Sequence, residues 1–534
     1  MALATAHTVA LQGALGHLID VQADVSPGSV GTTLVGRPDA ALQEAKDRCR
    51  MAVSNSGDNL WPATRRVTIL LAPSDLVKRG THFDLAIALA VLAATGDVSQ
   101  SALSDTLVIG ELTLNGGLRS VPGVLPMVMA ASRRGFDRVI VPEPQAREAA
   151  MVPGMTVLGM RSLAQVRAEL RGEVVPSAPP VAPMSGSRLI EWRGSRRLSE
   201  HDLSDLAGVS DVKYALEVAA AGGHHLMLSG PKGAGKTSLA ERLPGILPDL
   251  TVEESLELTA IHSLAGALEP GDDLIVRPPF FAPHHDASKA SLLGGGTGRV
   301  RPGEVSRSHC GVLFLDEFPL FRGDVIDALR QPLESGEVTI ARGEESATYP
   351  ARGMVVMACN PCPCGEYAAS SPGNSCTCSQ QQRLHYARKV TGPVHDRIDI
   401  LRHVLPPAKQ ESESAVPPVL EGLETSAEVR HRVAAARARQ HARFEGRDWR
   451  LNSQIPSAVL AREWPLPDAG TTRLQREVLE GRLSRRGAVR VQRIAWTVAD
   501  LRGADAPSSS DVDTAFRLRM GHPLLVAAIE RRAS

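Results

Sequence analysis

The chain has 534 residues, and at roughly 150 residues per domain this length predicts three or four folded units. Apolar residues make up 43% and charged residues 22%, which is typical of a globular protein that buries several cores. Lys and Arg together number 59, as do Asp and Glu together, so the formal net charge is zero. This balance excludes a chain-wide basic surface for nucleic acid. Aromatic residues are only 3%, which disfavours base stacking as the main binding mode.

The N-terminal segment predicts neither secretion nor membrane insertion. It has no Lys or Arg ahead of its apolar positions, where a secretory signal would carry them. The longest apolar run, Leu85–Ala94, is far shorter than the roughly 20 residues needed to cross a bilayer. Four of the 7 cysteines fall within Cys362–Cys378, which suits metal or reduced thiols better than disulfides. We therefore expect a cytoplasmic, multidomain protein without membrane contact.

Residues 1–172 predict an α/β unit. The runs Val67–Leu71 and Arg138–Pro142 have the composition of buried strands, and Asp39–Val53 shows helical spacing of its apolar positions. Strands that alternate with helices favour an α/β fold here and in the following unit. Residues 173–200 include a Pro- and Ser-rich stretch that predicts a linker.

A phosphate-binding motif follows the linker. His225–Ser229 predicts a short strand that leads directly into G-x-x-x-x-G-K-T and then a helix. Glycines let backbone N–H groups converge on phosphate oxygens at a helix N-terminus. Lys236 can reach the β- and γ-phosphates of ATP, and the Thr237 hydroxyl can bind Mg²⁺. The predicted nucleotide-binding residues are Gly230, Pro231, Lys232, Gly233, Ala234, Gly235, Lys236 and Thr237.

Two later segments, each predicted to be a buried strand, end in polar residues that would complete the nucleotide site. Gly311–Leu315 reads as a strand buried on both faces of a parallel sheet and ends in Asp316 and Glu317. Asp316 is predicted to bind Mg²⁺ and the nucleotide, and Glu317 to polarise the attacking water. The strand Met354–Ala358 precedes Asn360, whose amide can orient the same water. Together these motifs predict ATP hydrolysis rather than static nucleotide binding.

Two further features surround the last strand. Glu337–Ala341 and Ala347–Pro350 predict a β-hairpin. Two C-x-C pairs follow, and their four thiolates suffice for a tetrahedral Zn²⁺; free thiols in a tight turn and a redox function remain alternatives. His284 and His285 are adjacent, and on an extended segment they would point to opposite sides, so we do not predict a metal pair. The possible zinc ligands are Cys362, Cys364, Cys376 and Cys378.

A helical C-terminal unit is predicted for residues 425–534, after a second linker at residues 406–424. Ala427–Arg443 and Val489–Leu501 are its clearest helices. The unit carries 20 Arg, no Lys and 12 acidic residues, a net charge of +8. An Arg-rich helical surface and a phosphate-facing surface both account for this charge.

The motifs resemble those of the magnesium-chelatase-like AAA+ ATPases of the YifB/ComM type, over nearly the whole chain. The resemblance implies an AAA+ core at residues 201–405, with a hairpin that points into the pore of a homo-oligomeric, hexameric ring. It implies that Arg397 is an arginine finger that completes the site of the adjacent subunit. It also implies that Arg486 is the sensor-2 arginine of the lid, with Arg490 as a second candidate. The most specific segments are RPPFFAPHHDASKASLLGGG, RPGEVSRSHCGVLFLDEF, LRQPLESGEVTIAR and ACNPCPCG.

Residues 1–172 resemble the Lon-protease-like domain that precedes the ATPase in this family. The matching segments are LVGRPDAALQEAKDR, KRGTHFDLAIALAVLAATG and GELTLNGGLRSVPGVLP. Active peptidases of this type need a nucleophilic Ser and a Lys that activates it. The corresponding positions are His82 and Pro126. We therefore expect a non-proteolytic scaffold or ring-assembly domain.

The resemblance implies a DNA-acting motor that promotes branch migration in recombination or natural transformation. The residues themselves predict ATP and Mg²⁺ as cofactors, whereas the DNA partner rests on the resemblance and on the C-terminal charge. Two alternatives stay open: the ATPase subunit of a metal-chelatase complex, and a chaperone that remodels proteins.

Overall fold

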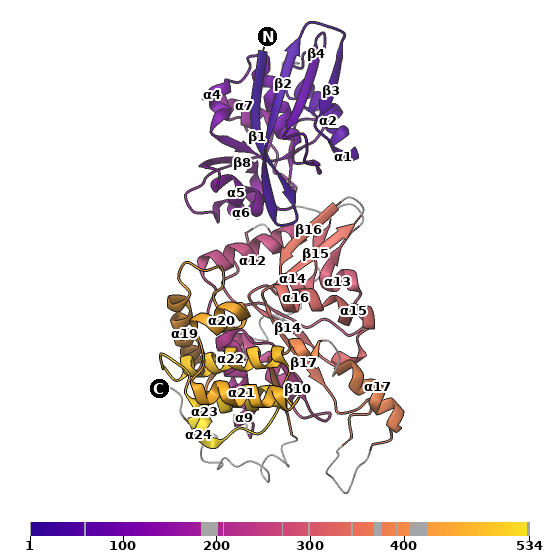
Figure 1. Cartoon of the computed structure of the whole chain (residues 1–534). Coiled ribbons are helices and arrows are strands. Elements are labelled where there is room, and N and C mark those ends of the chain that lie inside the picture. Colours follow the sequence, from indigo (N-terminus) through magenta and orange to yellow (C-terminus); the bar gives the residue numbers. More distant parts are fainter. Residues whose placement is uncertain are drawn as a thin grey trace.

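The computed structural model describes residues 2–57, 60–182, 201–206, 208–269, 271–296, 300–342, 345–367, 376–390, 394–405 and 424–530. An N-terminal α/β unit sits on a central α/β unit, and C-terminal helices pack against one side of the central unit (Figure 1). The predicted linkers fall largely outside the described residues, at 183–200 and 406–423. Within those residues, no helix is long and apolar enough to span a membrane. The predicted α/β fold with a helical C-terminus is confirmed.

The N-terminal unit is built on a mixed seven-stranded sheet of order β3-β4-β2-β1-β5-β8-β9. The predicted strands are β4 and β8. Along β4, buried residues alternate with more exposed ones, because neighbouring side chains point to opposite faces. The strands are β1 Ala2–Gln12, β2 Leu15–Ser26, β3 Gly31–Val35, β4 Arg66–Ala72, β5 Thr106–Val108, β8 Arg138–Pro142 and β9 Thr156–Met160, and a separate ladder pairs β6 Glu111–Leu112 with β7 Leu118–Arg119.

Helices cover this sheet. The longest apolar run forms α3, Asp84–Ala94, which is buried along nearly its whole length against β1 and β2. The predicted helix at 39–53 is two helices, α1 Ala40–Gln43 and α2 Ala45–Asn55, which meet at Glu44. The others are α4 Gln100–Ser104, α5 Val124–Ser132, α6 Ala146–Ala150 and α7 Leu163–Arg171.

The central unit has a parallel five-stranded sheet of order β11-β14-β17-β10-β18. Every residue of β14 and β17 is buried, as expected for strands covered on both faces. β10 comes first in the chain but lies between β17 and β18, so the strand order reverses beside it. Ligands of such sheets bind at the carboxyl ends of the strands, next to this reversal. The strands are β10 Leu226–Ser229, β11 Phe280–Phe281, β14 Val312–Leu315, β17 Met354–Cys359 and β18 Ile400–His403.

The predicted hairpin is present as β15 Glu337–Arg342 and β16 Glu345–Pro350. Its tip, residues 343–344, lies outside the described residues. The remaining elements of the unit are the ladder β12 Gly294–Gly295 with β13 Arg301–Pro302, and the helices α9 Ser210–Gly222, α10 Lys236–Glu241, α11 Leu243–Ile246, α12 Val252–Ala265, α13 Lys289–Leu293, α14 Glu304–Arg307, α15 Gly323–Ala328, α16 Arg330–Ser335 and α17 Gln380–Val390.

The C-terminal unit is helical and shares one hydrophobic core with the central unit. Val433 of the first helix and Ile494 of the fourth are fully buried in the cluster that also holds Leu226 of β10. The helices are α19 Ser426–Arg443, α20 Ser457–Glu463, α21 Asp468–Leu479, α22 Arg485–Leu501, α23 Ser509–Met520 and α24 Val526–Glu530.

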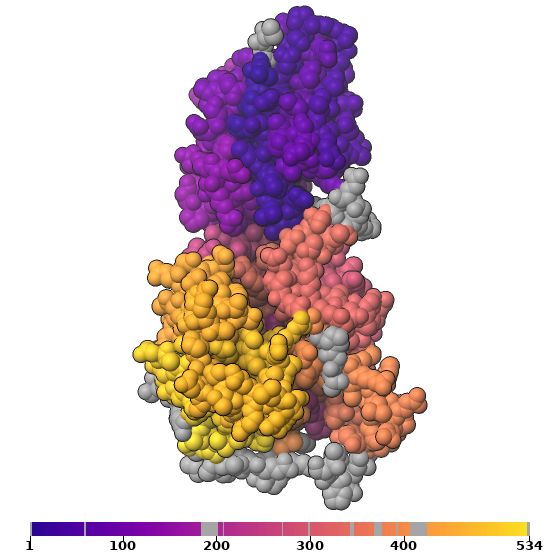
Figure 2. Space-filling model, in the orientation of Figure 1, coloured from indigo at the N-terminus to yellow at the C-terminus, as the bar shows by residue number. Residues whose placement is uncertain are grey.

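Among the described residues, the N-terminal unit contacts the central unit at several places (Figures 1 and 2), including an ion pair between Arg147 and Asp273. Helix α12 packs on α5, and Ser263 Oγ donates a 2.6 Å hydrogen bond to Glu148 Oε1. The turn between β1 and β2 meets β16, where an added Cβ at Gly13 would lie 2.8 Å from the Thr348 carbonyl oxygen. The predicted pore hairpin is therefore braced by the N-terminal unit.

Candidate functional site

The loop between β10 and α10 has the shape of a phosphate cradle. An added Cβ at Gly230 would lie 2.2 Å from the Val404 carbonyl oxygen, so only glycine fits there. Gly233 and Gly235 have φ angles of 72° and 87°, in the region that favours glycine. An added Cβ at either residue would meet no atom within 4 Å, so the loop borders open space. The first N–H groups of a helix have no partner within the helix and suit an anion.

Lys236 joins this loop to Asn360, the residue that follows β17. Its Nζ donates to the carbonyl oxygens of Gly230 at 2.7 Å and Pro231 at 2.9 Å, and to Asn360 Oδ1 at 3.0 Å. Burial lowers the pKa of Lys236, and the nearby Asp316 carboxylate opposes that shift. An ammonium has three N–H donors, so contact with a phosphate requires exchange of at least one of these bonds. The predicted phosphate-binding lysine and water-orienting amide thus lie together.

Thr237 and Asp316 lie at a separation that suits Mg²⁺. Thr237 Oγ1 donates to Asp316 Oδ2 at 2.8 Å. Adjacent oxygen ligands of an octahedral Mg²⁺ are roughly 3 Å apart, since each bond is about 2.1 Å long. The two oxygens therefore fit neighbouring corners of a magnesium coordination shell. Together with the glycine cradle and Lys236, they fit a nucleoside triphosphate bound with Mg²⁺.

Glu317 has an unusual backbone for a residue with a side chain. Its φ and ψ angles are 48° and 38°, in the left-handed region, which is costly and recurs at functional sites. Its N–H donates to Asp316 Oδ1 at 2.8 Å, which turns the chain sharply as β14 ends. The side chain is 45% exposed, so its carboxylate is accessible to water.

His285 is a site residue that sequence analysis did not assign. Its Nδ1 lies 3.8 Å from Glu317 Oε2. His285 follows β11, and β11 is the neighbour of β14, so the sheet order brings the two residues together. The position of His285 beside Glu317 depends on the pairing of β11 with β14. The sequence signal for β11 is weak, because it consists of two aromatic residues, Phe280 and Phe281.

The expected orientation of His284 and His285 was wrong. These residues occupy a turn rather than an extended segment, and their ring centroids are 4.1 Å apart. With Asp286 they form a group whose candidate ligand atoms all lie within 4.8 Å.

The two predicted catalytic arginines lie at the other end of the sheet. β10 and β18 are parallel, with Leu226 opposite Ile400, so Arg397 precedes the amino end of β18. The phosphate loop leaves the carboxyl end of β10, and four-residue strands span about 13 Å. Arg397 Nη2 binds Glu334 Oε1 at 2.7 Å, and Arg486 Nη1 lies 3.5 Å from the same oxygen. Neither arginine reaches the phosphate loop of its own chain.

Arg490, the second sensor candidate, is part of a buried charge cluster. It forms an ion pair with Asp399, which is 1% exposed. Burial would raise the pKa of Asp399, but Arg490, His224 and His225 outweigh it and hold the pKa well below its usual range. This ion pair connects α22 of the C-terminal unit to the residue before β18.

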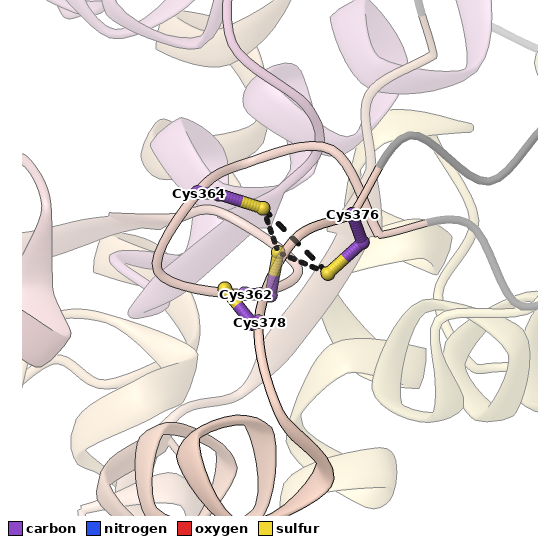
Figure 3. Close-up of side chains that lie close together, drawn as sticks. All are labelled: Cys362, Cys364, Cys376 and Cys378. Carbon is purple, nitrogen blue, oxygen red and sulfur yellow. Dashed lines mark hydrogen bonds between the residues drawn. The ribbon is translucent and has the colours of Figure 1, made fainter.

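The four clustered cysteines converge on one point (Figure 3). Cys362 Sγ lies 3.2 Å from Cys364 Sγ and 3.6 Å from Cys376 Sγ, and the last two sulfurs are also 3.6 Å apart. All four sulfurs, including that of Cys378, lie within 4.8 Å of one another. Disulfide sulfurs would be about 2 Å apart, whereas sulfurs around a tetrahedral Zn²⁺ are roughly 3.8 Å apart. The cluster can therefore hold a metal ion.

The C-terminal arginines are mostly engaged within the chain. Arg443 binds buried Asp500, and Arg432 binds buried Glu217. Such pairing matches the interpretation of the +8 charge as part of an Arg-rich helical structure. Other pairs with carboxylates involve Arg447, Arg450, Arg462, Arg473, Arg482, Arg502 and Arg517.

Known families match all three units. The family described as magnesium chelatase, subunit ChlI, matches residues 202–413. Two related descriptions, subunit ChlI of Mg-chelatase and the ChlI C-terminal region, match residues 21–145 and 423–519. The N-terminal unit is also similar to the Lon protease of Nitrosococcus oceani, at 28% identity over 143 residues, 26% of this chain and 18% of that protein.

Full-length relatives cover nearly the whole chain. An uncharacterized protein of Mycobacterium tuberculosis is 44% identical over 97% of this chain and 99% of its own length. The uncharacterized protein YifB of Escherichia coli is 38% identical over 98% and 99%, respectively. The competence protein ComM of Haemophilus influenzae is 37% identical over 94% of both chains.

Proposed function

The chain belongs to the YifB/ComM-type magnesium-chelatase-like proteins, and on that premise we propose that it hydrolyses ATP to drive a DNA-remodelling ring. One observation carries the ATPase: Lys236, Asn360 and the Thr237–Asp316 pair converge at the carboxyl ends of the central sheet. Lys236→Ala should abolish ATP binding, measured with a fluorescent ATP analogue. Wild-type affinity in that variant would contradict the assignment.

The residues divide the work by their chemistry. Bound Mg²⁺ would supply positive charge beside the phosphates. Thr237 and Asp316 would hold that ion, and Lys236 would neutralise phosphate oxygens at the helix N-terminus. Glu317, which is exposed and lies beside His285, would accept a proton from the attacking water, while the Asn360 amide orients that water.

We propose that the ring is needed to complete each site. Arg397 and Arg486 lie beyond the amino ends of the strands, away from their own phosphate loop, and so would serve the loop of a neighbour. Mass photometry with ATP should detect a hexamer. A chain that remains monomeric with saturating ATP and hydrolyses it at full rate would contradict this proposal.

The DNA substrate is proposed from family membership and from the relative named as a competence protein. The paired C-terminal arginines lend it little support. ATPase rate should be measured with and without forked and four-way DNA at several salt concentrations, and we expect stimulation that falls steeply as salt rises. No stimulation by DNA, with stimulation by a protein partner, would favour the chaperone or chelatase alternatives.

We propose that the N-terminal unit is a non-proteolytic scaffold. His82 is 4% exposed, and its Nε2 hydrogen-bonds with the Val9 carbonyl oxygen at 2.9 Å. Pro126 is buried within α5 and has no nucleophilic or basic group. Incubation with unfolded casein should leave the casein intact.

We propose that the four-cysteine cluster holds a structural Zn²⁺. Thiolates select soft or borderline metals over Mg²⁺, and four protein ligands fill a tetrahedral shell without an open position for catalysis. Elemental analysis of the full chain should find one Zn²⁺ per chain.

A further inference from the structure

We propose that Zn²⁺ binding by the four-cysteine cluster positions the phosphate loop and thereby sets its affinity for ATP. This inference rests on the proposed ATP and Zn²⁺ binding and adds a link between the two sites. The link has two parts: a backbone contact from the cluster to Lys232, and a hydrogen bond that returns from helix α17 to Asn360.

The first part is direct contact between the cluster and the phosphate loop. Gly365 follows Cys364, and its N–H donates to the Cys362 carbonyl oxygen at 3.0 Å, which forms a tight turn. An added Cβ on Gly365 would lie 2.8 Å from Cγ of Lys232 and 3.3 Å from its Cε. The turn that presents two sulfurs therefore rests along the alkyl chain of a phosphate-loop residue.

The second part follows from the path of the chain. Cys362 lies two residues after Asn360, and Cys378 lies two residues before α17 begins. On α17, the hydroxyl of buried Tyr386 accepts a 3.3 Å hydrogen bond from the Asn360 N–H. The chain therefore leaves Asn360, supplies both C-x-C pairs and contacts Asn360 again through α17. An ion bound by both C-x-C pairs would close this loop and reduce the conformational entropy that the return contact must overcome.

Helix α17 also reaches the turn that carries the predicted base. Lys389 Nζ donates to the Pro319 carbonyl oxygen at 2.9 Å, in the short 3-10 helix Phe318–Leu320 that follows Glu317. The guanidinium of Arg383 lies 4.5 Å from the Tyr367 ring centroid, which ties the start of α17 to the first cysteine segment. One helix thus connects the metal cluster to Asn360 and to the segment after Glu317.

The coordination of this ion by four thiolates limits it to a structural role. With four thiolates and no open position, it cannot bind substrate and acts through the positions of its neighbours. Mutation of the outer-shell groups that orient metal ligands typically costs about 10- to 100-fold in metal affinity or activity, and we expect an effect of similar size on the neighbouring loop. We therefore expect ion loss to weaken ATP binding while the P-loop residues themselves remain intact.

The test uses the full chain and three variants. Cys376→Ser combined with Cys378→Ser removes two ligands. Gly365→Ala leaves all four ligands but places a Cβ against Lys232 in a left-handed backbone, φ 86°. Gly446→Ala is the matched control, because φ there is 76° and an added Cβ meets nothing within 4 Å. The readouts are Zn²⁺ content, the Kd of a fluorescent ATP analogue, and hydrogen exchange in residues 226–241.

The expected outcomes separate the contact from the ion. The double cysteine variant should lose Zn²⁺, raise Kd about tenfold and exchange faster in the phosphate loop. Gly365→Ala should keep Zn²⁺ but raise Kd, whereas Gly446→Ala should change neither. If the cysteine variant does not fold, the Gly365→Ala result decides alone.

Four results would overturn the proposals, and they distinguish the link, the metal site and the ATPase. Zinc-free protein with wild-type Kd and exchange, or Gly365→Ala with wild-type Kd, would reject the link alone. A wild-type chain that binds ATP but takes up no Zn²⁺ on reconstitution would reject the metal site and with it the link. A folded wild-type chain with Zn²⁺ that binds no ATP would reject the proposed ATPase.

Discussion

The two ends of the central sheet hold opposite kinds of chemistry. At the carboxyl ends, the phosphate loop, Asn360 and the Thr237–Asp316 pair bond to one another at 2.7 to 3.0 Å. At the amino ends, two arginines converge on the single carboxylate of Glu334. The carboxyl ends present oxygens, amides and N–H groups that suit a magnesium nucleotide. The amino ends present arginines that are paired with carboxylates.

Under the proposed ring, this difference would mean that one chain carries both halves of a composite site without joining them. The central strands separate the halves by about 13 Å. The Glu334 carboxylate lies 2.7 Å from Arg397 and 3.5 Å from Arg486. The following four tests examine the roles assigned to the two ends, and the two arginine substitutions ask whether the amino end serves a neighbour's nucleotide.

The largest expected effect is from Arg397→Ala. An arginine that stabilises the transferring phosphoryl group is worth about a thousandfold or more in turnover. Mixed with a Lys236→Ala chain, the Arg397→Ala chain should regain activity, since its intact phosphate loop then meets a neighbour's Arg397. Steady-state ATPase assays across mixing ratios measure this. Equal ATPase activity of the Arg397→Ala and wild-type chains would contradict a catalytic role for the amino end of the sheet.

The amino end should also be the acid-sensitive end. Burial lowers the pKa of His224 to about 4, and nearby Asp399 only partly offsets this. Because the unfolded chain binds this proton at higher pH, stability is present above about pH 6.5 and is lost as pH falls toward 4. We expect a loss on the order of 3 kcal/mol.

Chemical unfolding followed by the lid tryptophans, at pH values between 4 and 7, checks this expectation. His224→Gln should weaken the dependence without removing it, because burial also lowers the pKa of neighbouring His225 to about 4. The exposed His431→Gln substitution should leave the dependence unchanged. A wild-type slope in the His224→Gln chain would contradict the assignment. The tryptophans are Trp449, Trp464 and Trp496.

At the carboxyl end, Glu317→Gln should separate binding from turnover. Loss of a positioned base typically costs about a hundredfold or more in rate, while the glutamine amide preserves the side-chain shape. ATP affinity should stay within about twofold, because Glu317 is not a predicted phosphate ligand. Single-turnover kinetics measures the rate. Normal turnover would transfer the role to another residue, with His285 the first candidate.

The smallest effect is expected from Arg486→Ala. Its side chain is 67% exposed, and a surface ion pair contributes at most about 1 kcal/mol to stability. If Arg486 contacts a neighbour's nucleotide, turnover should still fall although stability hardly changes. Adjacent Arg485→Ala, also exposed, is the control and should retain its activity. Equal effects of the two substitutions would reject a specific role for Arg486.

Local patterns were enough to predict much of the carboxyl end. The strand, glycine loop and helix around Lys236 are consecutive, and the buried runs before Asp316 and Asn360 follow from continuous apolar stretches. The helix expected at 39–53 divides at Glu44, because apolar spacing alone does not locate such a boundary. His285 was missed because strand pairing, rather than spacing, brings it to Glu317.

The sequence by itself determined the three units, the P-loop and the ends of the parallel strands, because backbone preferences and hydrophobic period act over a few neighbouring residues. Only the tertiary structure decided that Glu334 lies beside two arginines, that Asp399 pairs with Arg490 of α22, and that the cysteine turn rests on Lys232. These contacts connect segments far apart in the chain, and they form only when the packing of the whole core brings those segments together.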